Sequence, residues 1–246
     1  MEHLLRVTLI GLVSGVLGTG TGGLAAFFVN KVSNRFLSII LEFSAGLMTA
    51  VVCFELIPEA FELGGVGAAM TGVLSGVLII ILIEDFIKRM EAAKRKTGKS
   101  SLLRAGILMA IGIALHNFPE GFAVGSGFEA STSLGAMITL VIFIHDIPEG
   151  VAMAVPMRAG GFSRIKAFAV TVLSGIPMGF GALLGAILGE ISPGFIALCL
   201  GFAGGAMLYI VFGELVPESK RLYFGRMSSI GNVIGIICGI IVSILG

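Results

Sequence analysis

The chain has 246 residues, of which 56% are hydrophobic and only 13% are charged, and its formal net charge is +1. This balance excludes an ordinary water-soluble domain, and the near-zero charge gives no support for binding nucleic acid. The three cysteines lie in apolar runs and are not spaced as CxxC, so the sequence predicts neither a disulfide framework nor a thiolate metal site. We predict an all-α protein that crosses a membrane several times.

Eight apolar runs are long enough to cross a bilayer, for which a helix needs roughly 20 residues. In chain order they are 4–29, 37–61, 66–87, 102–126, 134–156, 166–188, 193–216 and 229–245. The first run has no convincing cleavage site after it, so we expect it to be retained as a span rather than removed as a signal peptide. We predict that residues 1–246 form a single transmembrane domain.

The basic residues predict the orientation of these spans. With eight spans, alternate loops share a side, and all but one of the 16 Lys and Arg residues fall on the same side; the exception is Arg6. Lys and Arg accumulate in cytoplasmic loops, so we expect a multi-pass protein of the cell's inner membrane with both termini outside the cytoplasm. The polar stretch 88–101 is then a basic cytoplasmic loop, which we interpret as an orientation anchor near the lipid surface.

One short motif occurs twice in the apolar runs, as HNFPEG at 116–121 and as HDIPEG at 145–150. Ionisable side chains at membrane depth are costly, and they normally face a protein interior or a wet cavity on an ion path. Residues four apart share a helix face, so His116 points with Glu120, and His145 with Glu149. The proline in each copy loosens its helix at this point. The two copies, which we call the twin motif, are therefore the predicted functional centre.

Imidazole and carboxylate ligands without thiolate suit zinc, iron(II), manganese or cobalt, whereas histidine argues against magnesium and calcium. The predicted cargo is a divalent transition metal, and no prosthetic group is expected. Asn117 and Asp146, one position further along each helix, could serve a second ion position. A single His/Glu pair could be an interhelical hydrogen bond, but its repetition with prolines favours a function.

A second repeat links two distant spans. AGLM at 45–48 and ELIPE at 55–59 resemble GGAM at 204–207 and ELVPE at 214–218. These spans are an odd number apart, so the copies run in opposite directions and predict a 3+2+3 inverted-repeat arrangement around the twin motif. The inversion places one acidic pair at each mouth of the ion path. These residues are candidate ligands or ordinary helix-end carboxylates: Glu55, Glu59, Glu214 and Glu218.

The twin motif, the eight spans, the basic loop and the repeat resemble the ZIP family of divalent-metal transporters, in its bacterial type. The resemblance implies uptake of zinc, or of Fe²⁺, Mn²⁺, Co²⁺ or Cd²⁺, into the cytoplasm, and a homodimer in the lipid bilayer. It also implies a mononuclear or binuclear site. Its candidate ligands are His116, Asn117, Glu120, His145, Asp146 and Glu149.

The chain departs from that family pattern in the sixth span. Bacterial relatives commonly have a glutamate where the segment 174–181 places Met178. The thioether is a further candidate ligand, and the missing carboxylate leaves open whether one or two ions bind.

The rival function is an intramembrane metal-dependent hydrolase, because His and acidic ligands also activate water. The chain has only three histidines, of which His3 is terminal, and it has no HExxH or GxSxG motif. A GxGxxG match at 18–23 follows no predicted strand, so we interpret it as a helix-packing face. We therefore expect a transporter and not an enzyme.

Overall fold

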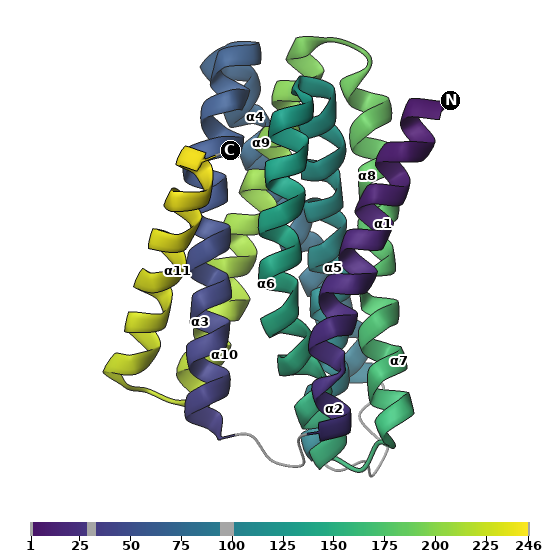
Figure 1. Cartoon of the computed structure of the whole chain (residues 1–246), viewed down its shortest axis with the longest axis vertical. Coiled ribbons are helices and arrows are strands. Elements are labelled where there is room, and N and C mark those ends of the chain that lie inside the picture. The colour runs from purple at the N-terminus through teal and green to yellow at the C-terminus, as the bar shows by residue number, and fades with distance from the viewer. Residues whose placement is uncertain (1, 29–32, 94–100, 246) are drawn as a thin grey trace.

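The computed structural model describes residues 2–28, 33–93 and 101–245, and all of their regular structure is helical (Figure 1). The prediction of an all-α protein is confirmed for this part of the chain. The α-helices and the two π-helices η1 and η2 are, in chain order, α1 (Glu2–Gly23), α2 (Ala25–Phe28), α3 (Asn34–Val51), η1 (Val52–Leu56), α4 (Ile57–Ala93), α5 (Ser101–Ala130), α6 (Thr132–Ala159), α7 (Arg164–Ser174), α8 (Ile176–Gly189), α9 (Pro193–Ile210), η2 (Val211–Leu215), α10 (Val216–Leu222) and α11 (Arg226–Leu245).

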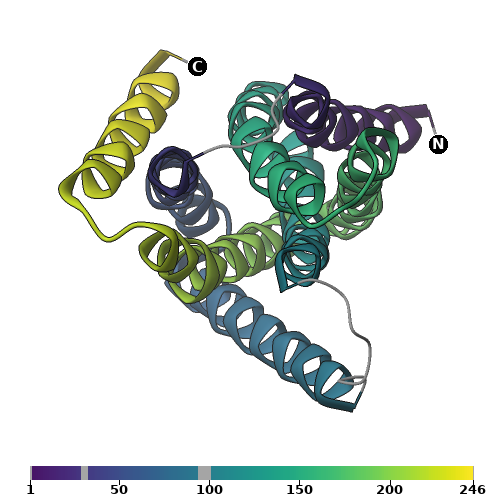
Figure 2. The same ribbon diagram turned by 90° about the horizontal axis from the view of Figure 1, so that it is seen from below.

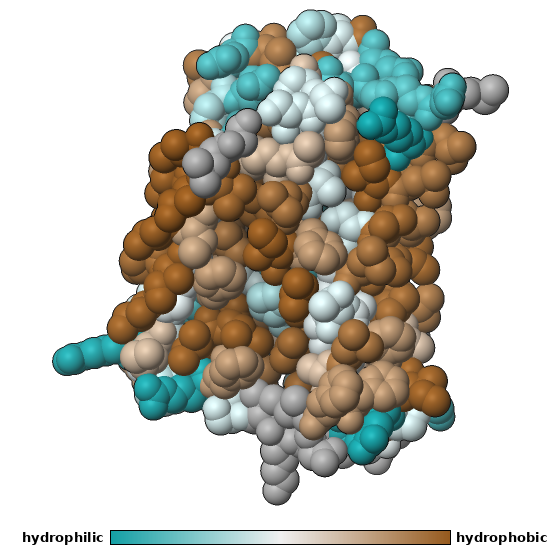
Figure 3. Space-filling view, viewed as in Figure 1, coloured by the Kyte–Doolittle hydropathy of each residue, from teal (hydrophilic) through white to brown (hydrophobic). Residues whose placement is uncertain are grey.

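Six helical stretches in the described residues are long and apolar enough to cross a membrane. Figure 3 shows a broad apolar band with hydrophilic residues gathered toward its two ends, and exposed leucine, isoleucine and phenylalanine side chains make up much of that band. Apolar side chains gain from facing lipid rather than water. The chain is therefore an integral membrane protein.

The count of six differs from the eight predicted spans for two reasons. The stretch Asn34–Phe86 counts once although it contains the predicted runs 37–61 and 66–87. A kink divides it at Gly65, whose φ of 70° and ψ of 173° suit glycine alone. The predicted run 102–126 lies in α5, and the side chains of its first turns are outside the described set.

The basic stretch 88–101 is only partly visible. Helix α4 continues through Ala93 and α5 begins at Ser101, so the first part of the predicted loop is helical. Residues 94–100 lie outside the described residues.

The helices pack in pairs, which Figure 2 shows end-on. Helix α3 packs along α11 and α4 along α9, whereas α1 packs along α6 and α5 along α8. Gly46 of α3 and Gly205 of α9 occupy the same place in the two repeat copies. A Cβ atom on Gly46 would overlap the carbonyl oxygen of Asn232 in α11, and one on Gly205 would overlap that of Val73 in α4. Both copies of the repeat therefore use a glycine to bring two backbones together.

The two repeat copies also share an unusual backbone. Each has a π-helix directly before its proline: the N–H of Ile57 donates to the carbonyl of Val52, and the N–H of Val216 donates to that of Val211. A proline disturbs the preceding helical turn because it lacks an N–H and its ring crowds the carbonyl four residues earlier. A wider π-turn accommodates this disturbance, and such turns are frequent at functional sites.

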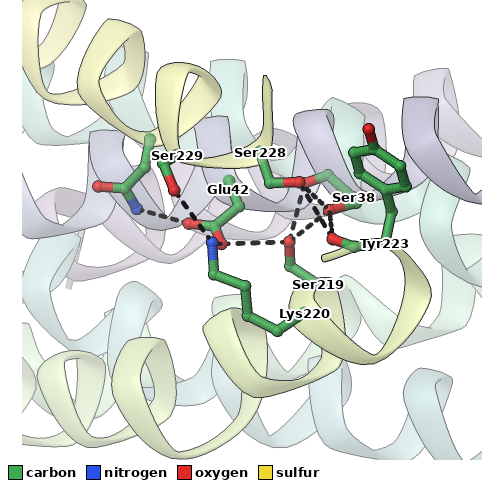
Figure 4. A network of polar contacts seen from close by, with 8 residues as sticks. Ser38, Glu42, Ser219, Lys220, Tyr223, Ser228 and Ser229 are labelled. Atoms are coloured by element: carbon green, nitrogen blue, oxygen red, sulfur yellow. Dashed lines mark hydrogen bonds and ion pairs between the residues drawn. The ribbon is translucent and has the colours of Figure 1, made fainter. Parts of the chain in front are cut away.

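A buried polar network joins α3, α10 and α11 near the lower end of the bundle (Figure 4). Its centre is Glu42, which is only 2% exposed. The carboxylate accepts from Lys220 Nζ at 2.9 Å, Asn232 Nδ2 at 3.0 Å and Ser219 Oγ at 3.2 Å. Ser38 extends the network through hydroxyl contacts of 2.8 Å to Ser219 and 2.6 Å to Ser228. Every oxygen of this buried carboxylate thus has a donor.

Lys220→Met is expected to destabilise the protein, because it leaves the Glu42 carboxylate buried without its cation. Breaking a buried ion pair costs about 3–5 kcal/mol, and the 30% exposure of Lys220 reduces this to about 2 kcal/mol. The thermal midpoint of the detergent-purified protein should fall, and the double variant Glu42→Gln/Lys220→Met should recover part of the loss. Arg221→Met is the matched control, because Arg221 is 77% exposed and its ion pair with Glu218 lies on the surface. Equal midpoints for Lys220→Met and the control would contradict the prediction.

Candidate metal centre

The twin motif lies in the middle of two helices that pack against each other. Helix α5 carries His116 and Glu120, and helix α6 carries His145 and Glu149. All four side chains are buried, with at most 1% of any residue exposed. Each helix contributes one imidazole and one carboxylate from a single face, because residues four apart lie one above the other.

The side chains of the two helices meet. His145 Nε2 lies 2.8 Å from Glu120 Oε1 and 3.8 Å from Asp146 Oδ1. Two sets of three ligand atoms each fit within 4.8 Å of one another: His116 with Glu120 and Glu149, and Glu120 with His145 and Asp146. We call these the first and the second ligand group. They share Glu120, so the geometry offers two neighbouring ion positions connected by one carboxylate.

Most side-chain nitrogen and oxygen atoms of the twin motif have no hydrogen-bond partner among the described residues. Among the described side chains, ten buried nitrogen or oxygen atoms have no hydrogen-bond partner, and nine belong to the twin motif. They are both ring nitrogens of His116, Nδ1 of His145, Oδ1 of Asn117, Oε2 of Glu120 and both carboxylate oxygens of Asp146 and Glu149.

An unpaired buried polar atom costs about 1–3 kcal/mol, and an isolated buried charge costs more. Three carboxylates and two imidazoles here have atoms without a hydrogen-bond partner. A desolvated cation bound between them would supply the missing partner.

The prolines act on the backbone around this site. Pro119 and Pro148 both lie inside continuous helices, and each removes the N–H that would bond to the carbonyl of Leu115 or Ile144. One turn of α6 has an outside partner, because Ser44 Oγ of α3 donates to the carbonyl of His145 at 3.0 Å. Helix α3 therefore contacts α6 directly in the turn that precedes Pro148.

Asn117 and Met178 differ from the other candidates. Asn117 Nδ2 donates to the Ser174 carbonyl at 2.7 Å, so its amide is held by α7 and only its Oδ1 is open. Met178 is fully buried against two glycines: a Cβ on Gly15 would lie 3.1 Å from its sulfur, and a Cβ on Gly121 would overlap its backbone. The structure thus shows Met178 as a packing residue, and a role as ligand stays a prediction.

The four repeat carboxylates have separate surroundings. Glu55 accepts a hydrogen bond from Ser243 Oγ of α11, and Glu59 is half-buried. Glu218 pairs with Arg221 at 3.1 Å.

Glu214 reaches α5, where its Oε2 lies 3.3 Å from the place of a Cβ on Gly112. Gly112 is one helical turn from His116. Glu214 therefore lies within about one helical turn of His116 along α5, and its predicted place with Glu218 at the cytoplasmic mouth stays a prediction.

Sequence reasoning missed Glu42 and Ser44. Neither belongs to a motif, and their partners lie about 100 or more residues away: His145 for Ser44, and Ser219, Lys220 and Asn232 for Glu42. The one available signal was a carboxylate at position 42 inside an apolar run, which membrane energetics makes unusual.

Known proteins resemble the chain over most of its length. The sequence model of the family described as ZIP Zinc transporter matches residues 89–245, which include both copies of the twin motif. The zinc transporter ZupT of Akkermansia muciniphila is 34% identical over 266 aligned residues, covering 99% of this chain and 98% of the relative. ZupT of Corynebacterium glutamicum is 36% identical over 82% of this chain and 85% of the relative. The zinc transporter GufA of Myxococcus xanthus is 32% identical over 94% and 96%.

Proposed function

Since the chain belongs to the ZIP Zinc transporter family, we propose that it carries zinc across the membrane into the cytoplasm through the twin motif of α5 and α6. It is a transporter and not an enzyme, as the family and the relatives are. Transport of zinc therefore replaces the hydrolase alternative.

The observation that carries the proposed site is the cluster of nine unpartnered buried atoms in the twin motif. The first and the second ligand group each supply one histidine and two carboxylates, which is a donor set that suits Zn²⁺. We assign His116, Glu120, Glu149, His145 and Asp146 as ligands, with Asn117 Oδ1 as an additional donor. Such a site of nitrogen and oxygen atoms at a helix break can release its ion, whereas a closed thiolate site holds zinc too tightly for transport.

The ion path extends from this site toward both ends of the bundle. Glu55 and Glu59 line the outer part, and Glu214 receives the ion one turn below His116 before Glu218 releases it. The contact between Glu214 and α5 at Gly112 supports this order. Matching π-helices and matching glycine contacts in the two repeat copies support a 3+2+3 inverted repeat, in which eight spans rock around the site.

The orientation and the assembly rest on the sequence. We assign the protein to the cell's inner membrane as a multi-pass protein with both termini outside, and the basic stretch 88–101 to the cytoplasm, because Lys and Arg accumulate on that side. We also propose a homodimer, and Fe²⁺, Mn²⁺, Co²⁺ and Cd²⁺ as competing cargo.

The direct test is uptake into proteoliposomes by the purified protein, with each of the five ions, with and without a pH gradient. Zinc should accumulate at a rate that saturates with concentration, and empty liposomes should take up none. Zinc uptake no faster than that of empty liposomes would overturn the proposed function.

Zinc uptake should fall as the pH is lowered equally on both sides of the membrane. The reason is competition, because a metal binds only deprotonated imidazole and carboxylate. Initial rates measured with equal pH on both sides exclude any effect of a gradient. A rate that rises in acid would contradict simple competition, and proton co-transport or another rate-limiting step would have to replace it.

A further inference from the structure

Helix α1 packs on α6 at the second copy of the twin motif, through the glycines of the GxGxxG match at 18–23. A Cβ on Gly22 would overlap the carbonyl oxygen of Ile147, and a Cβ on Gly150 would overlap that of Thr19. At these positions the nearest atoms belong to the backbone. Gly22 and Gly150 thus let the two helix backbones touch, which is the usual role of small residues between membrane helices.

Gly18 has different neighbours. The three atoms nearest to the place of its Cβ all belong to the side chain of Asp146: Cβ at 2.6 Å, Oδ2 at 2.9 Å and Cγ at 3.2 Å. Asp146 is fully buried, and neither of its oxygens has a hydrogen-bond partner. The space at Gly18 is therefore filled by a metal-ligand candidate and not by a backbone.

We propose that Gly18 is a positioning residue of the transport site, because the absence of a side chain there leaves the Asp146 carboxylate its place in the second ligand group. This inference rests on the proposed function and adds a residue of α1 to it. The contacts of Gly22 and Gly150 keep α1 at a fixed distance from α6, so a methyl group at position 18 meets Asp146 and turns its carboxylate away from His145 and Glu120. The first ligand group does not contain Asp146, so we expect it to stay intact.

The test compares Gly18→Ala with Gly20→Ala. Both changes place alanine in the same helix, where alanine is favoured over glycine by about 1 kcal/mol. Among the described residues, a Cβ on Gly20 meets only Cγ2 of Val172, at 3.3 Å, so Gly20→Ala adds the same atom away from the site. Zinc bound by the detergent-purified full chain is counted after equilibrium dialysis against buffered zinc, and initial zinc uptake is measured in proteoliposomes.

Gly18→Ala should lower the zinc capacity per chain by about half, as loss of one of the two ligand groups implies, and Gly20→Ala should leave it unchanged. Asp146→Ala should lower the capacity equally, and adding Gly18→Ala to it should lower it no further, because both changes act on the same carboxylate. Gly18→Ala with the capacity of the unchanged protein would overturn the inference, as would a further loss in the double variant.

A folding defect would leave the inference testable. If Gly18→Ala alone does not fold, the double variant with Asp146→Ala should fold, since the second change removes the atoms that the new methyl group meets. A double variant that still fails would overturn the inference. The proposed function fails separately, when the unchanged protein and Gly20→Ala both bind no zinc.

Discussion

Glu120→Gln is expected to abolish zinc transport, with a fall of at least about 100-fold in the initial rate in proteoliposomes. Glu120 is the one residue that belongs to both ligand groups, so its loss removes a charged donor from both ion positions. Glutamine keeps the size of the side chain, and its carbonyl oxygen can still accept from His145, which now lies 2.8 Å from the carboxylate. The variant should therefore fold and reach the membrane.

The matched control for this variant is Glu129→Gln, which makes the same change on the same helix. Glu129 lies near the C-terminal end of α5, outside the ligand groups. Its carboxylate pairs with His3 of α1 at 2.6 Å. Its replacement should leave the rate within about twofold, because exposed ion pairs contribute little. Substantial transport by Glu120→Gln would remove the shared carboxylate from the ion path.

Glu149→Ala is expected to lower zinc flux nearly to that of empty liposomes while the protein stays folded. Both carboxylate oxygens of Glu149 are buried and have no hydrogen-bond partner, so the substitution breaks no hydrogen bond within the described residues. Burying an unpaired charge is costly, so its removal offsets the cost of the cavity that alanine leaves. The thermal midpoint without zinc should therefore stay the same or rise.

Zinc should stabilise the unchanged protein against heat more than it stabilises Glu149→Ala, because a ligand that binds the folded state raises the thermal midpoint more when it binds more tightly. Glu190→Ala is the control, since Glu190 is exposed at the end of α8. Undiminished flux by Glu149→Ala, or the same zinc-dependent rise in both proteins, would contradict the assigned role.

The helix positions, and the residues that could share a candidate site, were predictable because both depend on local sequence. The twin motif has its ligands four residues apart, and helix geometry alone places them on one face. The described helices α5 and α6 contain these residues in their interiors, and His145 meets Glu120 across them. The two ligand groups share one carboxylate because of the way α5 and α6 are rotated against each other. No local sequence pattern determines this rotation.

The surroundings of Glu214 could not be predicted, because they depend on a π-helix. Counting along a regular helix placed Glu214 with Glu218 at a mouth, whereas η2 adds a wide turn that carries Glu214. A π-turn shifts the face of every later residue, and hydrophobic periodicity does not detect one inserted residue. Pro217, which follows this turn, is visible in the sequence. A proline predicts that the preceding helical turn is disturbed, but it does not predict that the turn becomes a π-helix.

Glu42 could not be assigned for a different reason. A lone carboxylate in an apolar run predicts a partner without naming it. Its partners Ser219, Lys220 and Asn232 come from the other end of the chain, and only the packing of α3 along α10 and α11 brings them together. The GxGxxG segment at 18–23 was correctly interpreted as a packing face, but its contact with Asp146 depends on the same kind of long-range packing.

The most direct measurement is anomalous diffraction at the zinc absorption edge from crystals of the protein soaked in zinc. The account predicts anomalous peaks among His116, Glu120 and Glu149 and among Glu120, His145 and Asp146, and both peaks should be lost in Glu120→Gln. Zinc found only at other places in a protein that transports zinc would contradict the account.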